Sequence, residues 1–221
     1  MTGPSVSVVI PAHNAEPFLT DAIDSVLGQT VAVELIVVND GSTDETGRVI
    51  ASYGDRLIQI AQEQRGLGAA RNRGVTEARG KWVAFLDADD IWVPDKTERQ
   101  LRVAAEHPDC DMLFGHGIEF TDPGTQWPAR TEPFPAYCAS AMMTRRTIVD
   151  ALAGFDESGT VGEFLDWYSR AKQMGARSWM IDPVVFHRRV HGANMTRTAV
   201  NKREQYLDVL QAHLSRRRSE S

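Results

Sequence analysis

Cysteine is scarce in this sequence, and long apolar stretches are absent from it. Its 221 residues include only two cysteines, Cys110 and Cys138, and neither has the CxxC or His/Cys spacing of a zinc site. We expect both to be reduced thiols in a cytoplasmic protein. No apolar run approaches the roughly 18 residues that span a bilayer, and residues 1–4 lack the charged-then-apolar pattern of a signal peptide. The sequence therefore predicts a cytoplasmic protein without a transmembrane segment.

Positive charge is also in short supply, except near the C-terminal end. The chain carries 24 Lys and Arg against 30 Asp and Glu, for a net charge of −6. Residues 181–221 nevertheless hold eight Lys and Arg against four Asp and Glu, so the rest of the chain is strongly acidic. Binding to nucleic acid requires a dense basic face, so we expect no nucleic-acid partner. An acidic body instead favours a site that concentrates carboxylates around a cation.

Short apolar segments alternate with helical periodicity in the first half of the chain. The predicted strands cover residues 6–10, 34–38, 57–60 and 82–86, and helical patterns lie between them. These strands are apolar on both sides, which is typical of a parallel sheet covered by helices. We predict an α/β fold of the Rossmann-like type: a single domain whose central, mostly parallel sheet has helices on both faces.

After residue 95 the pattern changes, although no linker or internal repeat divides the chain. Residues 122–136 contain four prolines and predict a long irregular loop, which in a compact domain is more often functional than idle. The remaining predicted elements are a helix at 96–106, a strand at 111–114, an extended stretch at 137–144, helices at 146–153 and 163–174, a strand at 179–186 interrupted by Pro183, and a helix at 200–214.

Polar clusters follow three of the predicted strands, at residues 11–14, 39–42 and 87–90. Ligands of open parallel sheets bind beyond the carboxyl ends of the strands, so we expect all three clusters on one rim. Asp87 and Asp89 bring two carboxylates close together, and these repel each other unless a cation or a proton intervenes. This arrangement favours Mg²⁺ or Mn²⁺, completed by phosphate oxygens, over an acidic turn that merely caps a helix.

For two further residues, the sequence spacing is compatible with two different roles. Asp40, in the segment Asp-Gly-Ser, either forms an ordinary turn or accepts hydrogen bonds from a nucleotide base. Arg71 lies among small residues at 66–74 and either pairs with a diphosphate or holds an aspartate in place. The glycines of this segment do not form a GxGxxG pattern, so a dinucleotide site is not supported.

Six blocks, in order, resemble the signatures of the family 2 glycosyltransferases, which are inverting enzymes of the GT-A fold. The blocks are residues 8–14, 37–44, 68–72, 85–90, 154–157 and 191–194. The resemblance implies a GT-A catalytic domain at residues 1–199, with a nucleotide-binding half at 1–95 and an acceptor half at 96–199. Residues 200–221 would then be a C-terminal helix and basic tail.

The resemblance also implies roles for individual residues. Asp40 would hold the base, most often uracil in this family, and Asp87 would face the ribose or donor sugar. Asp89 and His191 would bind Mg²⁺ or Mn²⁺ beside the diphosphate. The residues implied to contact the nucleotide sugar are Pro11, Ala12, His13, Glu16, Asp40, Arg71, Asp87 and Ala88.

The catalytic base is where this sequence departs from the family. Family members open the helix after the Gly-Phe-Asp-Glu block with a Glu-Asp pair whose aspartate is the base. Here Glu163 matches the glutamate, Phe164 occupies the aspartate position, and Asp166 matches a following acidic site. Phenylalanine cannot accept a proton. Glu163 and Asp166 are three residues apart on one helix face, so either could reach the acceptor, and we favour Glu163.

The expected function is metal-assisted transfer of a hexose-type sugar from a nucleoside-diphosphate sugar, with UDP as the favoured nucleotide, by single displacement with inversion. The sequence does not identify the acceptor, which could be a sugar, a peptide, a lipid-linked molecule or a small molecule, and it leaves a homodimer open. Because Phe164 occupies the position of the base, a non-catalytic module that binds a nucleotide sugar is one alternative function. A sugar nucleotidyltransferase is the other alternative, although residues 11–14 lack the Gly-, Arg- and Lys-containing loop expected after its first strand.

Overall fold

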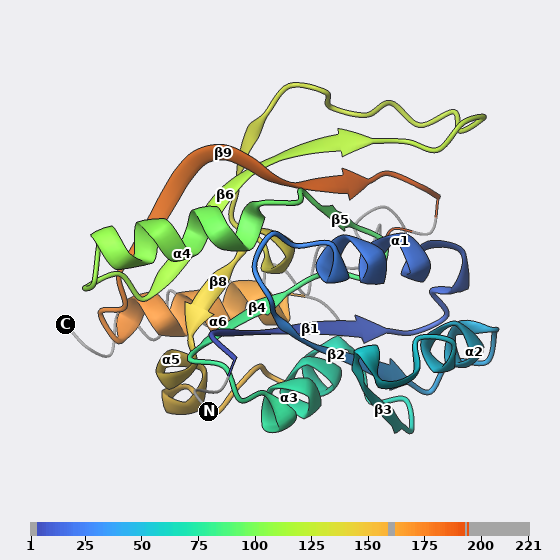
Figure 1. The fold of residues 1–221 in the computed structure, drawn as a ribbon, viewed down its shortest axis with the longest axis horizontal. Helices are drawn as coiled ribbons and strands as arrows, with labels where there is room; N and C mark the ends of the chain where they lie inside the picture. Colours follow the sequence, from blue (N-terminus) through green and yellow to red (C-terminus); the bar gives the residue numbers. More distant parts are fainter. Residues whose placement is uncertain (1–3, 159–161, 193, 195–221) are drawn as a thin grey trace.

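The computed structural model describes residues 4–158, 162–192 and 194, and these form one mixed sheet with helices against both faces (Figure 1). The strand order is β3-β2-β1-β4-β8-β6-β9-β5, and β7 pairs with β6 beside this path. The strands are β1 Val6–Ala12, β2 Glu34–Asp40, β3 Ile58–Gln62, β4 Trp82–Phe85, β5 Ile91–Trp92, β6 Met112–Phe120, β7 Phe134–Ala136, β8 Met143–Arg145 and β9 Ser178–Arg189.

The helices agree closely with the predicted ones where the periodic pattern is long. The observed helices are α1 Glu16–Leu27, α2 Thr46–Ala51, α3 Leu67–Glu77, α4 Lys96–Glu106, α5 Arg146–Ala151 and α6 Glu163–Gln173. Proline near the start of α1 and Gly28 at its end bound the longest of these helices, because proline suits the first turn of a helix. No helix in the described part of the chain is long and apolar enough to cross a bilayer.

The strands β1, β2, β3 and β4 are parallel and form the half of the sheet that was predicted from apolar runs. Every residue of β1 is buried, and its side chains alternate between two core layers. Val8 and Ile10 pack in the layer that includes α1 residues such as Ile23. Val9 packs on the opposite face, in the layer that includes Val75 of α3 and Trp167 of α6. Burial on both faces explains why the strand sequence is apolar throughout.

The second half of the sheet departs from the sequence prediction in length and direction. β6 continues to Phe120 and pairs in parallel with β9, whereas β8 is antiparallel to both β4 and β6. Pro183 does not interrupt β9, because the register passes from Phe114↔Met180 to His116↔Val184 and leaves residues 181–183 in a bulge. A bulged residue needs no ladder hydrogen bond, so proline is tolerated there.

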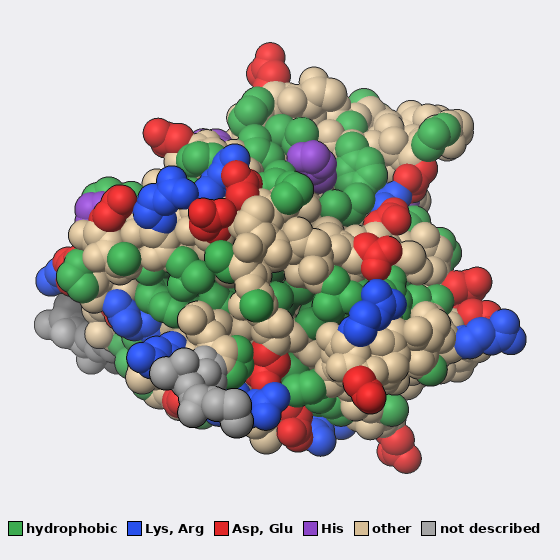
Figure 2. Space-filling model, viewed as in Figure 1, with side chains coloured by type: hydrophobic (Ala, Val, Ile, Leu, Met, Phe, Trp, Pro, Cys, Tyr) green, Lys and Arg blue, Asp and Glu red, His purple; other side chains and the backbone are tan. Residues whose placement is uncertain are grey.

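A long hairpin connects β6 to β7 and stands out from the body of the domain (Figure 1). Hydrophobic side chains gather on this upper layer in the space-filling view (Figure 2). The predicted irregular loop at 122–136 is largely present, although its last residues form β7. The predicted extended stretch at 137–144 instead contains a 3₁₀ turn, Ala139–Ala141, before β8 begins. The helix predicted at 200–214, and with it the proposed tail at 200–221, lies outside the described residues.

Candidate functional site

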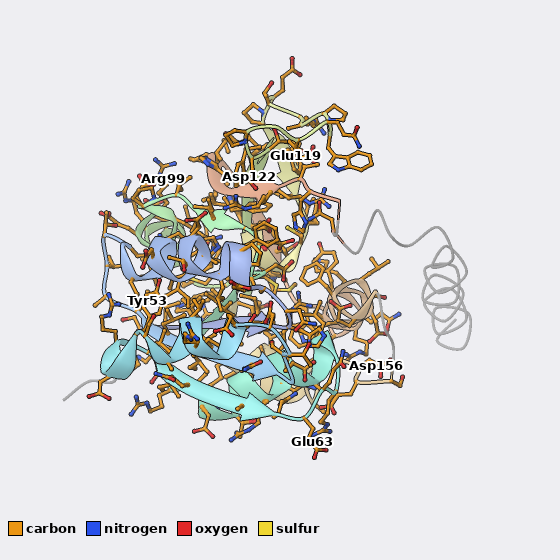
Figure 3. The ribbon with its side chains drawn as sticks, turned by 90° about the vertical axis from the view of Figure 1, so that its right-hand side faces the viewer. Tyr53, Glu63, Arg99, Glu119, Asp122 and Asp156 are labelled. Carbon is orange, nitrogen blue, oxygen red and sulfur yellow. The ribbon has the colours of Figure 1, made fainter. Side chains whose placement is uncertain are left out.

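The polar clusters after β1, β2 and β4 meet at one rim of the sheet, as their spacing predicts. β1 and β2 are paired up to Ala12↔Asn39, and the Asn14 amide donates to Ser42 Oγ at 3.0 Å. His13 Nδ1 lies 2.7 Å from the main-chain oxygen of Asp40. On the other side of β1, the Leu86 amide donates to Val9 O at 3.1 Å. Figure 3 looks toward this rim, because the view of Figure 1 is turned so that the arrowhead of β1 faces the reader.

Asp40 is buried, and its carboxylate organises the turn that leads into α3. Oδ1 accepts hydrogen bonds from Gln62 Nε2 at 2.7 Å and from the Arg65 amide at 2.8 Å. Oδ2 accepts from the Gly66 amide at 2.8 Å. An ionised carboxylate has about four acceptor positions, so these contacts occupy most of its capacity. The turn interpretation of Asp40 therefore has direct structural support, and a base would meet a carboxylate held rigidly in place.

The predicted pocket residues at the end of β1 and the start of α1 differ in solvent exposure. Pro11 and Ala12 end β1, and both are buried. His13 is exposed, and its Nε2 lies 3.2 Å from Gln64 Nε2. Glu16 is exposed at the first position of α1, where its amide donates to Asp44 Oδ2 at 3.3 Å.

Arg71 connects the turn that follows β4, residues 87–90 (the acidic turn), to the start of α6. Its side chain is 2% exposed; Nη2 donates to Asp87 Oδ1 at 2.8 Å, and Nη1 forms an ion pair with Glu163. Burial opposes the charge on the guanidinium, but the two carboxylates more than offset this and raise the pKa of Arg71. The contact with Asp87 is the one expected if Arg71 holds an aspartate in place.

The acidic turn concentrates negative charge in a partly buried place. Burial raises the pKa of Asp87, and the neighbouring Asp89 adds to this effect while Arg71 opposes it. The pKa of Asp90 is raised well above its usual range by burial and by Asp89 and Asp87. Asp90 is held by Ser140 Oγ at 2.8 Å. Carboxylates in this arrangement repel one another, so a bound cation would be favourable.

His191 is within hydrogen-bond distance of Asp89, although 102 residues separate them in the sequence. Its Nε2 is 3.0 Å from Asp89 Oδ2. Asn194 Nδ2 donates to the same oxygen at 3.1 Å. An oxygen and an imidazole nitrogen that converge in this way are suitable ligands for Mn²⁺ or Mg²⁺. Within residues 4–158, 162–192 and 194, no three His, Cys, Asp or Glu side chains form a metal cluster, so substrate oxygens and water would have to complete the shell.

The two candidate bases face different arginines. Glu163, at the first position of α6, is 8% exposed and contacts Arg71. Asp166 accepts from Arg170 Nε at 2.7 Å, and Arg170 in turn donates to Leu152 O at 2.7 Å. Phe164 is half-buried, with its ring 6.2 Å from that of Tyr168 and nearly parallel to it.

Several residues that support the site carried no role in the sequence prediction. Asn72 of α3 donates to Phe155 O at 2.8 Å and to Glu157 Oε1 at 2.9 Å, so it ties the Gly-Phe-Asp-Glu block to the rim. Glu157 also pairs with Arg65, which lies in the turn organised by Asp40. The motif at 154–157 was a signal for this region. Ser140 had no individual role in the prediction, although the stretch that contains it, residues 137–143, was expected to help shape the acceptor pocket.

Comparison with known proteins agrees with this geometry. Residues 7–161 match the family model described as glycosyl transferase family 2. An uncharacterized glycosyltransferase of Rickettsia prowazekii is 29% identical over 96% of this chain and 72% of its own length. Another, from Rickettsia typhi, is 30% identical over 92% of this chain and 69% of its own length.

Solved structures share the fold at low sequence identity. TarS of Staphylococcus aureus in complex with UDP-GlcNAc has a TM-score of 0.77 at 20% identity, over 95% of this chain and 65% of that chain. The mannosyltransferase PcManGT of Pyrobaculum calidifontis, in complex with GDP-Man and Mn²⁺, has a TM-score of 0.68 at 20% identity, over 86% of this chain and 58% of that chain. These likenesses confirm the predicted GT-A fold.

Proposed function

Because the chain belongs to glycosyl transferase family 2, we propose that it transfers a hexose-type sugar from a nucleoside-diphosphate sugar to an acceptor, with inversion at the anomeric carbon. The observation that carries the proposal is the rim at which Asp40, Asp87, Asp89 and His191 lie at the carboxyl ends of β2, β4 and β9, with His191 3.0 Å from Asp89. This is where ligands of open α/β sheets bind. Residues 1–95 are proposed as the nucleotide-binding half and residues 96–199 as the acceptor half.

UDP is the proposed nucleotide. Support comes from the shared fold of TarS, solved with UDP-GlcNAc. PcManGT was solved with GDP-Man, so donors with both nucleotides are tested. Asp40 would hold the base, and Asp87, oriented by Arg71, would face the ribose or the donor sugar. The proposed pocket lining is Pro11, Ala12, His13, Glu16 and Ala88.

Asp89 and His191 are the residues proposed to hold Mg²⁺ or Mn²⁺. When bound, the cation supplies positive charge against the negative charge that develops on the leaving diphosphate. The chain's own contribution is to hold the carboxylate and the imidazole 3.0 Å apart, and to keep Asp87 on the buried arginine beside them. Groups fixed in this way need no reorganisation during the reaction.

The base is proposed to be Glu163 or Asp166, which would take the proton of the acceptor nucleophile as it attacks the anomeric carbon. Glu163 is next to the acidic turn through Arg71, which favours it by position. Its ion pair with that arginine also supports a holding role for it, in which case Asp166 would be the base. Variants of the two residues separate these cases, as set out in the Discussion.

Nucleotide-sugar binding without transfer is a second candidate function. It is favoured by the half-buried Phe164 at the family's base position and by the arginine partners of both nearby carboxylates. A protein of this kind would keep the rim and bind the donor, but it would turn over no acceptor.

A panel of UDP- and GDP-sugars tests the proposal, first by thermal melting with and without Mn²⁺. A donor that binds the native state raises its melting temperature, so we expect one nucleotide class to stabilise the protein more in the presence of Mn²⁺. The stabilising donor is then incubated with sugar, peptide and lipid-linked acceptors. Release of nucleoside diphosphate with formation of a β-linked product from an α-linked donor supports inverting transfer. Stabilisation without turnover on any acceptor supports the binding module, and no stabilisation by any donor contradicts both.

A further inference from the structure

Arg189, the last residue of β9, is a buried arginine whose guanidinium reaches three other segments. Its Nε donates to the main-chain oxygen of Asp89 at 3.2 Å, and Nη2 contacts Asp21 of α1 at 2.5 Å. Nη1 forms an ion pair with Asp122, which follows β6. The arginine side chain is only 5% exposed, whereas those of Asp21 and Asp122 are 54% and 45% exposed. The guanidinium therefore lies beneath the surface and binds its two carboxylates from the inside.

The backbone of Arg189 contacts the same acidic turn. Its amide donates to Asp90 Oδ1 at 3.1 Å, and its carbonyl accepts from Asn194 Nδ2 at 3.1 Å. Asn194 also donates to Asp89 Oδ2. Side chain and main chain of this one residue thus hold Asp89 and Asp90 at several points.

Ring contacts extend this arrangement to His191. The guanidinium carbon of Arg189 lies 5.2 Å from the ring centre of Phe18 and 4.6 Å from that of Phe120. The Phe18 ring in turn lies 4.4 Å from that of His191. In Figure 3, Asp122 lies beside the β9 ribbon at the base of the β6–β7 hairpin, next to Glu119. Arg189 therefore contacts Asp89 directly and His191 through the ring of Phe18.

Only arginine suits this position. Its planar guanidinium has five donors in a fixed fork and can stack on aromatic rings, whereas the ammonium group of lysine is a compact point charge. A lysine at this position would keep the positive charge, but it could not hold the oxygen of Asp89 and both carboxylates in the same geometry.

On the basis of the proposed function, we propose that Arg189 is a positioning residue for Asp89 and His191, the two residues proposed to bind the cation. It fixes the main chain of Asp89 and, through Phe18, the ring of His191, so that Oδ2 and Nε2 converge. The diphosphate of the donor and its cation are the ligands that this spacing serves. Supporting groups around metal ligands typically change metal affinity by roughly 10–100-fold when they are replaced.

The test is direct titration of the purified full chain with Mn²⁺, following free Mn²⁺ by electron paramagnetic resonance, without donor or acceptor. Arg189→Lys should weaken Mn²⁺ binding by about tenfold or more. The matched control is Arg188→Lys, because Arg188 precedes Arg189 on β9 and pairs with Glu119 of β6 at 2.9 Å. It should bind Mn²⁺ within about twofold of the unmodified chain, since the Glu119 partner of Arg188 lies on β6 and not in the acidic turn. Circular dichroism melts of both variants report whether each is folded.

Non-additivity gives a second readout. In an Asp89→Ala background, Arg189→Lys should cause no further loss of Mn²⁺ binding, because the arginine acts through Asp89. If Arg189→Lys does not fold, Asp21→Asn removes the negative charge of one exposed partner of the guanidinium and should weaken Mn²⁺ binding in the same direction but by less.

Three results would overturn the inference. They are unchanged Mn²⁺ affinity in a folded Arg189→Lys variant, equal losses in the two arginine variants, and an unmodified chain that binds a UDP-sugar but no Mn²⁺. The last result also removes the cation from the proposed mechanism, but it leaves the proposed sugar transfer to be decided by the assay with acceptors. Conversely, failure to find any transfer does not affect the Mn²⁺ titration, so the two proposals fail independently.

Discussion

Arg71 and Glu163 form an ion pair in which both side chains are almost completely buried, at 2% and 8% exposure. They come from α3 and α6, 92 residues apart in the sequence. The same guanidinium holds Asp87, so the acidic turn after β4 and the start of α6 are connected through one buried cation. A buried pair of this kind is sensitive to the loss of either partner, because the remaining charge is left uncompensated.

Glu163→Ala should therefore lower the free energy of unfolding by about 3–5 kcal/mol, measured by urea denaturation. Glu163→Gln should lower it less, because the amide oxygen still accepts a hydrogen bond from Arg71. Arg73→Ala, which removes an exposed arginine of α3 that pairs with Glu77, should change it by at most about 0.5 kcal/mol. Equal effects of Glu163→Ala and Arg73→Ala would contradict the importance of the buried pair.

The same positions identify the base. The residue that accepts the proton should lose about 10²–10⁴-fold in kcat when it is replaced by its amide. Glu163→Gln and Asp166→Asn are measured side by side with the donor that stabilises the protein most. A large loss in one variant assigns the base, and full turnover in both would exclude both residues from that role.

Asp89→Ala should reduce sugar transfer by at least about 10²-fold, because it removes a group that supports charge stabilisation on the leaving diphosphate. Treatment with a chelator should have a comparable effect, reversed by added Mn²⁺. Asp109→Ala is the control, since Asp109 is an exposed aspartate that pairs with Arg177 away from the acidic turn. Full activity of Asp89→Ala, or full activity with the chelator present, would contradict the metal-assisted mechanism.

Gly68→Ala should destabilise the protein by about 1–3 kcal/mol, although alanine favours helix by about 1 kcal/mol. A Cβ atom at Gly68 would lie 2.2 Å from Asp156 O, so α3 and the block at 154–157 could not keep their present distance. Urea denaturation measures the change in stability. A variant as stable as the original chain would show that this close approach is not required.

Lys96 gives a prediction about pH. Its side chain is buried over the ring of Trp92, at 3.9 Å, and donates to Gln100 Oε1 at 2.7 Å. Burial lowers the pKa of Lys96 to about 7, whereas an unfolded chain has a lysine pKa of about 10.4. Between these values the unfolded state binds the additional proton, so stability should increase with pH.

The slope from this one group should be on the order of 1.4 kcal/mol per pH unit between about pH 7 and pH 10. Burial raises the pKa of the nearby Cys138 to about 12, so this thiol lowers stability as pH rises above about 8.5. That contribution is common to the original chain and the Lys96 variant, so their difference reports Lys96. Lys96→Met removes the titration, and its stability should rise less steeply than that of the original chain. Parallel curves for the two proteins, measured by denaturation at pH 7, 8 and 9, would contradict this prediction.

The first four strands and the longer helices were predictable because their signals are local. A run such as residues 35–38 is apolar because both faces of β2 are buried, and α4 was predicted with its observed bounds. The length of β6 and the course of β9 through Pro183 were not predictable, since both depend on a pairing between segments more than 60 residues apart. No local pattern encodes the register of such a pair.

By itself, the sequence determined the α/β alternation, the rim where the polar clusters meet, and the residue types available there, including Asp89 and His191. Only the tertiary structure decided the partners: Arg71 on Asp87 and Glu163, and Arg189 beneath the acidic turn. The physical reason is that a buried charge requires a partner, but any of several acidic residues satisfies that requirement until the packing of distant elements brings one of them within hydrogen-bond distance.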